Sequence, residues 1–71
     1  MTQYRIMKSF SRELDVTLYA LQLSTDGGSH WTTMNASMFS ADIKHSCQDG
    51  RNSDIKMEAW KAFQSGHSTY L

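Results

Sequence analysis

Apolar and polar residues alternate along most of the first half of the chain. From Tyr4 to Met34 the pattern has a period of two and is rich in Thr, Tyr and Leu, which is typical of β-strands. It predicts three strands, at residues 3–11, 16–23 and 30–35. A polar turn is expected at residues 12–15.

The strongest local signal is the pair Gly27 and Gly28 within a polar segment. Adjacent glycines readily adopt the positive φ angles that a two-residue hairpin turn of the primed type requires. Centring the turn on them sets the register of the second and third strands. The expected pairs are Ser24 with Trp31, Leu23 with Thr32, Gln22 with Thr33, and Leu21 with Met34.

In this register the second strand carries apolar side chains on both faces. One face would hold Val16, Leu18, Ala20 and Trp31, and the other Tyr19, Leu21, Leu23 and Met34. A hairpin with one face in water alternates apolar and polar residues, whereas a strand that is apolar on both faces is covered on both sides. The pattern therefore predicts that both sides of the second strand are covered.

The pattern becomes helical after Ser53. This serine is a good N-cap, and Asp54 places a negative charge in the first turn, where it suits the helix dipole. The apolar stripe of the helix consists of Ile55, Ala59, Ala62 and Phe63, with Trp60 beside it. Gly66 is a natural C-terminal stop.

A weaker helix is expected at residues 38–47, where Ser37 can act as the cap. Its apolar residues recur every four positions, at Phe39, Ile43 and Cys47. The sequence thus predicts one small α+β domain over residues 1–71, a three-stranded antiparallel β-meander followed by one or two short α-helices. A helix of roughly 12 residues is only about 18 Å long, so two of them are not expected to cover both sheet faces. Apolar surface is then left for another chain.

The segment from Ser24 to Trp31 also contains Asp26 and Gly28, in the spacing Ser-x-Asp-x-Gly-x-x-Trp. It resembles the Asp-box, whose usual form is Ser-x-Asp-x-Gly-x-Thr-Trp and which recurs in the blades of sialidase-type propellers. His30 stands where threonine is usual. The resemblance covers eight residues and implies a structural hairpin in which Asp26 bonds turn amides and Trp31 packs on the turn. It implies no sialidase activity.

Composition and length narrow the functional classes. A chain of 71 residues is too short for a barrel enzyme or a dinucleotide-binding fold. Cys47 is the single cysteine, so an intramolecular disulfide cannot form. The sequence also lacks an apolar leader and a run long enough to cross a membrane, and these features together predict a cytoplasmic protein.

The seven basic and seven acidic side chains cancel, but they are unevenly placed. The first twelve residues carry three cations and no acid: Arg5, Lys8 and Arg12. Residues 13–43 carry acids, beginning with Glu13 and Asp15, and no lysine or arginine. The basic strand could contact an acidic partner or phosphates, and the acidic hairpin a basic protein surface. The alternative is that charges on an edge strand discourage aggregation.

Candidate chemistry is sparse. His45 and Cys47 are the closest pair of metal-ligating residues, but structural zinc requires four ligands in paired spacings that this sequence lacks. A nucleophile, a base and an orienting acid could come from Cys47, from His45 or His67, and from Asp42 or Asp49. No local signature supports such a set. We therefore expect no metal, no cofactor and no enzymatic activity.

These observations predict a small protein-binding module. It would dock as a homodimer or onto a larger protein as an inhibitor or accessory factor, in the manner of small bacterial and phage proteins. The partner-binding candidates are Tyr19, Leu21, Leu23, Met34 and Trp60, and the charged contact candidates are Arg5, Lys8, Arg12, Glu13 and Asp15. For Trp60 and Phe39, a place in the core is the favoured role. The alternative function is a weak nucleic-acid-associated module that uses the basic N-terminal strand, and three cations would support only weak binding.

Overall fold

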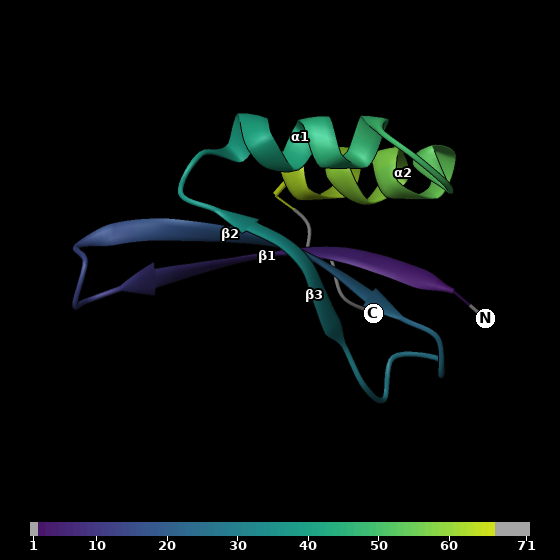
Figure 1. Cartoon of the computed structure of the whole chain (residues 1–71), viewed down its shortest axis with the longest axis horizontal. Helices are drawn as coiled ribbons and strands as arrows, with labels where there is room; N and C mark the ends of the chain where they lie inside the picture. Colours follow the sequence, from purple (N-terminus) through teal and green to yellow (C-terminus); the bar gives the residue numbers. More distant parts are fainter. Residues whose placement is uncertain (1, 67–71) are drawn as a thin grey trace.

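The computed structural model describes residues 2–66. It shows the expected α+β arrangement, a three-stranded antiparallel sheet in the order β1-β2-β3 followed by two helices. The elements are β1 (Gln3–Ser11), β2 (Val16–Ser24), β3 (Thr32–Ser37), α1 (Ser40–Gln48) and α2 (Ser53–Gln64). Both helices lie on the same face of the sheet (Figure 1), so the fold has two layers.

The two strand pairs differ in length. β1 and β2 pair from Gln3 opposite Ser24 to Ser11 opposite Val16, and the predicted turn at residues 12–15 joins them. β3 pairs only with residues 19–23 of β2. The first three residues of β2 therefore have a strand on one side only.

Two of the predicted pairs of β2 and β3 are observed, Leu23 with Thr32 and Gln22 with Thr33, whereas the predicted pair of Ser24 with Trp31 is not. After two pairs the register shifts, and Leu21 lies opposite Asn35 rather than Met34. Met34 is the extra residue of a β-bulge, so the expected Leu21–Met34 pair is wrong. β3 also begins two residues later than expected, at Thr32, because residues 25–30 form a wide loop instead of continuing the strand pairing.

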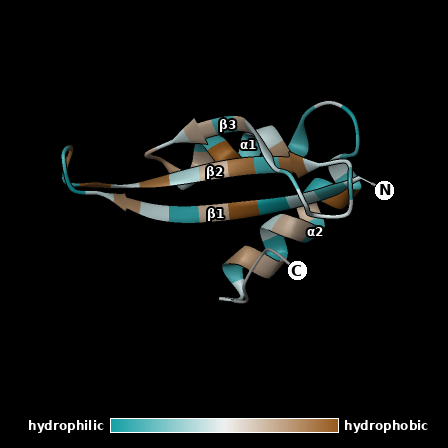
Figure 2. Cartoon of the chain, turned by 90° about the horizontal axis from the view of Figure 1, so that it is seen from below, coloured by the Kyte–Doolittle hydropathy of each residue, from teal (hydrophilic) through white to brown (hydrophobic). Residues whose placement is uncertain are grey.

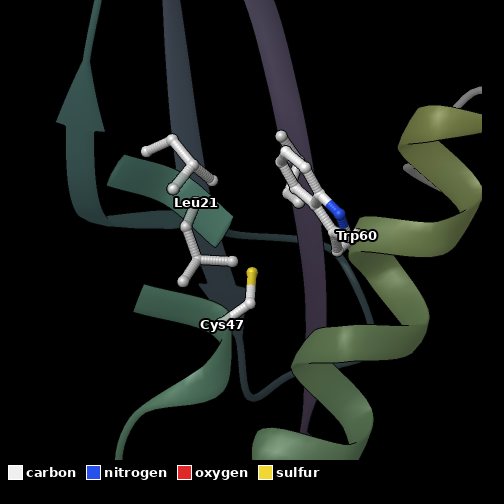
Figure 3. Packing of buried hydrophobic residues seen from close by; sticks show 5 residues of the cluster. Leu21, Cys47 and Trp60 are labelled. Carbon is white, nitrogen blue, oxygen red and sulfur yellow. The ribbon is translucent and has the colours of Figure 1, made fainter. Parts of the chain in front are cut away.

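The core lies between the sheet and the helices. Its buried apolar residues are Ile6, Leu21, Ile43, Cys47 and Trp60. Figure 3 shows how Leu21, Cys47 and Trp60 come together from the sheet and from both helices. The face of β2 that carries Leu21 is thus the covered one.

α1 begins two residues later than expected. Phe39 occupies its N-cap position and contributes no capping side chain. The predicted cap, Ser37, instead holds the connection that precedes the helix: its hydroxyl accepts a hydrogen bond from the Phe39 N–H and donates one to Asp42. Ser37 therefore lies two residues before the N-cap position and does not cap the helix itself.

α2 occupies the expected segment, but its first residues play different roles. Ser53 is the first helical residue, and the N-cap position belongs to Asn52, whose φ of 60° is left-handed. The prediction that Ser53 caps the helix is therefore wrong. Gly66, with a φ of 78°, follows the last turn as predicted, and its N–H donates to the carbonyl of Phe63.

The buried face of α2 is also rotated from the expected stripe. Lys56 and Trp60 are its buried residues, whereas Ile55 is 41% exposed. The Lys56 ammonium donates a hydrogen bond to the carbonyl of Asp49, at the C-terminal end of α1. A cation is favourable at a helix C-terminus, so α2 turns this lysine inward and its aliphatic stem packs in the core.

Candidate functional site

The β1–β2 hairpin projects beyond the rest of the sheet and past the ends of the helices (Figure 1). We call residues 9–18, where β1 and β2 pair only with each other, the arm. A two-stranded ribbon is marginally stable by itself in water and gains stability by packing against other elements. The arm is thus the part of the sheet with the least support from its own chain.

Large apolar side chains are exposed at this end of the molecule. Six large apolar side chains of residues 2–66 are exposed, and four of them belong to the arm or to the β3–α1 connection, which lies at the same end (Figures 1 and 2). These four are Phe10 (58% exposed), Leu14 (64%), Met38 (47%) and Phe39 (62%). We call them the arm-end patch.

Local structure explains why these side chains are in water. Phe10 lies on the helix side of β1, four residues after the buried Ile6, but it belongs to the arm, which extends past the ends of the helices (Figure 1). Leu14 lies in the turn, where its N–H donates to the hydroxyl of Ser11 at 3.4 Å. Phe39 precedes α1 rather than joining its buried face, so the core position favoured for Phe39 is wrong.

Four charged side chains accompany the arm. They are Lys8 at its base and Arg12, Glu13 and Asp15 in its turn. All four are exposed, and in the part of the chain that the structure describes none of them forms an ion pair. Two cations and two anions therefore surround the arm with no net charge.

Arg5 is separated from the other cations of the first strand. It is three residues from Lys8, so the two side chains leave opposite faces of β1. The guanidinium of Arg5 lies 4.2 Å from the centroid of the Trp31 ring, and its Nε donates to Oε1 of Gln22 at 2.7 Å. Gln22 in turn donates to the hydroxyl of Thr33 at 3.2 Å. The basic residues of the first strand thus do not form one surface.

Asp26 organises the loop between β2 and β3. Its Oδ1 accepts hydrogen bonds from the Ser24 hydroxyl (2.8 Å) and from the N–H groups of Ser29 (3.1 Å) and His30 (3.0 Å). Its Oδ2 lies 2.6 Å from Nδ1 of His30. These contacts hold the pKa of Asp26 well below its ordinary value, and the hydrogen bond with the His30 side chain has the largest effect. The prediction that Asp26 bonds turn amides is confirmed.

Trp31 completes this loop. Its Nε1 donates to the carbonyl of Gly28 at 3.0 Å, which confirms that the ring packs on the turn. Gly27 and Gly28 have the predicted positive φ values, 78° and 99°, but they lie in a wide loop, so the prediction of a two-residue hairpin turn is wrong. Both oxygens of the Asp26 carboxylate already have partners, so the loop has a structural role.

The five partner-binding candidates differ in how far the folded chain buries them. Leu21 and Trp60 are 2% and 6% exposed, so they lie in the core of the chain and not on its surface. Tyr19 is half-buried against α2, with its ring edge-on to a phenylalanine of that helix. Leu23 is half-buried, and Met34, at the bulge, is 52% exposed.

The opposite face of β2 is turned away from both helices (Figure 1). Val16, Leu18 and Ala20 are half-buried on it, and no helix or strand of residues 2–66 packs over them. The expectation that both faces of β2 are covered is therefore not met within the described chain.

The residues considered for catalysis or metal binding are not brought together. Burial raises the pKa of the Cys47 thiol, an effect that the charge of Lys56 partly opposes, and His45 is exposed. His67 lies outside the described residues. Among residues 2–66, no three His, Cys, Asp or Glu side chains are grouped so that they could hold a metal ion. In the same range, no helix combines the length and the apolar character needed to cross a membrane.

The arm-end patch was not anticipated, although its members were visible in the sequence. Leu14 is the clearest signal, because it is a large apolar residue among the charged residues of a predicted turn. The exposure of Phe10 and Phe39 depends on where the helices end, which no local pattern reveals. No protein-family model, curated protein or solved structure matches this chain.

Proposed function

We propose that this chain is a small protein-docking module that works through its arm-end patch. The observation that carries the proposal is that four of the six exposed large apolar side chains of residues 2–66 lie at one end of the molecule. Covering apolar surface that is in contact with water is favourable, and exposed apolar side chains concentrated in one region are typical of protein contact surfaces.

The make-up of this end suits a protein partner. Phe10, Phe39 and Met38 belong to the residue types that are enriched in the centres of interfaces. Lys8 and Glu13 lie near the patch as an exposed, charged rim, which is the usual boundary of such a contact. The separation of Arg5 from Lys8 argues against the alternative, a nucleic-acid surface along the first strand.

Docking of this kind requires no catalytic group. The module would act as an inhibitor or accessory factor by covering a surface of its partner, or by assembling with a copy of itself. A cytoplasmic setting is part of the proposal, because the single cysteine is suited to a reducing compartment.

Site-specific photo-crosslinking tests the proposal. A photoreactive residue is placed at Leu14 or Phe39 in the full chain, and matched probes are placed at Lys44 and Glu58, which are exposed on the outer sides of the helices. We expect discrete higher-mass adducts in cells from the arm-end probes and not from the helix probes. Equal adduct formation at both sets, or none at the arm end, would overturn the proposal.

A further inference from the structure

We infer that the arm binds a second copy of this chain, and that the two copies pair through the edge of β2 at residues 16–18. The inference rests on the docking function proposed above and names its partner. Its starting point is a gap in the sheet. β3 ends at Ser37, opposite Tyr19, while β2 continues for three residues toward the turn.

The gap leaves part of a strand edge free. Within residues 2–66, the strand beside residues 16–18 is β1 alone, and no backbone hydrogen bond joins them to the β3–α1 connection. A strand edge of this kind is a template for pairing with another chain. The end of β3 and the turn at residues 12–15 limit the gap, so only a short strand fits it.

A second copy carries a strand of the required length, its own residues 16–18. An antiparallel pair centred on Thr17 places Val16 of each copy opposite Leu18 of the other. Such a contact uses the same surface on both copies and is closed by two-fold symmetry. It therefore produces a dimer and not a fibre.

The same geometry joins the separate parts of the arm-end patch. Beyond Val16 the chain of each copy enters its turn, which then lies next to the end of β3 in the other copy. Leu14 is exposed in that turn, and Met38 and Phe39 are exposed in the connection that follows β3. Leu14 of each copy would thus cover Met38 and Phe39 of the other.

The charges of the arm are complementary in this arrangement. The turn carries Arg12, Glu13 and Asp15 and so has one net negative charge, Lys8 lies at the base, and none of these four residues forms an ion pair within residues 2–66. Antiparallel arms bring the turn of one copy toward the base of the other, so that opposite charges approach one another. A balanced set of charges favours a second copy over a partner of one sign.

The two outer edges of the sheet suit self-pairing less well. Two β1 strands paired antiparallel would bring the cations Arg5 and Lys8 of one copy close to those of the other, and like charges on paired strands are destabilising. β3 carries no charge, but its bulge at Met34 interrupts the edge and twists it. The edge at residues 16–18 has neither obstacle.

Size sets the expected strength of the dimer. A contact limited to three paired residues and two turns buries less than the roughly 800 Å² per partner of a standard interface. We therefore expect weak, rapidly exchanging self-association, with a dissociation constant on the order of micromolar to hundreds of micromolar.

Sedimentation velocity of the purified full chain, from about 1 to 1000 μM, tests the inference. Thr17→Lys places two cations opposite each other on the two-fold axis, and we expect self-association to weaken at least ~tenfold. Ser9→Lys is the matched control, because it adds the same charge to the same arm on the β1 side. Circular dichroism establishes that both variants fold.

A reciprocal charge pair locates the contact. Leu14→Asp and Phe39→Lys, each alone, should weaken the dimer, because each puts a charge into an apolar contact. The two substitutions in one chain should restore it, because each Asp then meets a Lys of the other copy. If the double variant self-associates no more strongly than the single variants, the two-fold geometry is overturned.

The outcomes separate this inference from the docking function. A wild-type chain that stays monomeric over the whole range, or equal weakening by Thr17→Lys and Ser9→Lys, would overturn the dimer. If such a chain still forms arm-end adducts with a different protein, the docking function stands and the second copy is excluded as its partner. If neither self-association nor adducts are found, both proposals fail.

Discussion

Ile6 and Phe10 lie four residues apart on the same face of β1, but one side chain is buried and the other is exposed to water. Ile6 is 1% exposed under the helices, whereas Phe10 is 58% exposed on the arm. The strand presents both side chains in the same way, so the difference comes from the helices, because the arm that carries Phe10 extends past their ends (Figure 1). Exposure in this fold is therefore set by the reach of the second layer.

Polar groups follow the same division. In the helix layer, Lys56 of α2 is buried and its ammonium donates a hydrogen bond to the Asp49 carbonyl. Around the arm, the charges of Lys8 and Glu13 have no ion partner in the described chain. The covered region is satisfied by its own chain, and we interpret the arm as the region that is completed by another.

The largest expected effect contrasts one leucine from each region. Leu21→Ala should lower the free energy of unfolding by about 2–5 kcal/mol, because it leaves a cavity in the core. Leu14→Ala, at a side chain that is 64% exposed, should change it by less than about 0.5 kcal/mol. Urea denaturation at low protein concentration measures both.

A milder variant guards against complete unfolding of the Leu21→Ala chain. Ile6→Val removes one methylene group from the same core and should lower the free energy of unfolding by about 0.5–1.5 kcal/mol. A similar decrease in the free energy of unfolding for substitutions at Leu14 and at these core positions would contradict the division into a covered region and an exposed arm.

The next effect concerns the buried cation. Lys56→Ala should lower the free energy of unfolding by about 1–3 kcal/mol, because the Asp49 carbonyl at the end of α1 loses its charged donor and the packed stem is removed. Lys44→Ala is the control, because this lysine is exposed on α1. Thermal unfolding followed by circular dichroism distinguishes the two variants. An equal loss of stability in both would show that the Lys56 hydrogen bond does not stabilise the C-terminal end of α1.

Acid should act on the loop that Asp26 organises. The pKa of this carboxyl in the folded chain is lowered from its ordinary value of 3.8, chiefly by the hydrogen bond with His30. Its contribution to stability is therefore complete above about pH 4 and is lost as the pH falls toward the lowered folded value.

Melting temperatures of the wild type and Asp26→Asn between about pH 2.5 and 7 test this dependence. The variant should melt lower at neutral pH, and the difference should shrink in acid. Asp15→Asn changes the same charge in the arm and keeps a residue that tolerates a positive φ, so it serves as the control. A constant difference between Asp26→Asn and wild type over the whole range would contradict the assignment.

The smallest expected effect is a contrast in thiol reactivity between the core and the arm. Cys47 has no exposed surface and its pKa is raised by burial, so Ellman's reagent should modify it only when the fold opens. In a Cys47→Ala chain, Leu14→Cys should react as fast as a free thiol. Fast modification of wild-type Cys47 without denaturant would show that the core beneath the helices is accessible to the reagent in the folded chain.

Local patterns predicted most of the fold. The alternation over residues 3–11 placed β1 within its observed bounds, and centring the turn on Gly27 and Gly28 placed two pairs of the second hairpin correctly. The bulge at Met34 was missed, because the register was extended from the turn as if no residue could be inserted. The face of α2 was missed because Lys56 is polar, and only its position beside the end of α1 makes burial favourable.

The candidate site was predicted only in part. Lys8, Arg12, Glu13 and Asp15 were singled out from the charge pattern, and they surround the arm. The apolar candidates were taken from the face of β2 that proves to be covered, because that strand is apolar on both sides and its sequence does not say which side the helices choose. Leu21 and Trp60 therefore belong to the core, and the exposed patch consists of other residues.

By itself, the sequence determined the number and order of the strands, the turn at residues 12–15 and the approximate positions of the helical segments, since each depends on side chains that are close along the chain. Only the tertiary structure decided which face of the sheet both helices cover, how far they reach, and hence that β3 and the helices stop short of the arm. These outcomes depend on the packing of residues that are distant in sequence, such as Leu21, Cys47 and Trp60. A hydrophobic residue carries the same local signal whether its own chain or another one covers it.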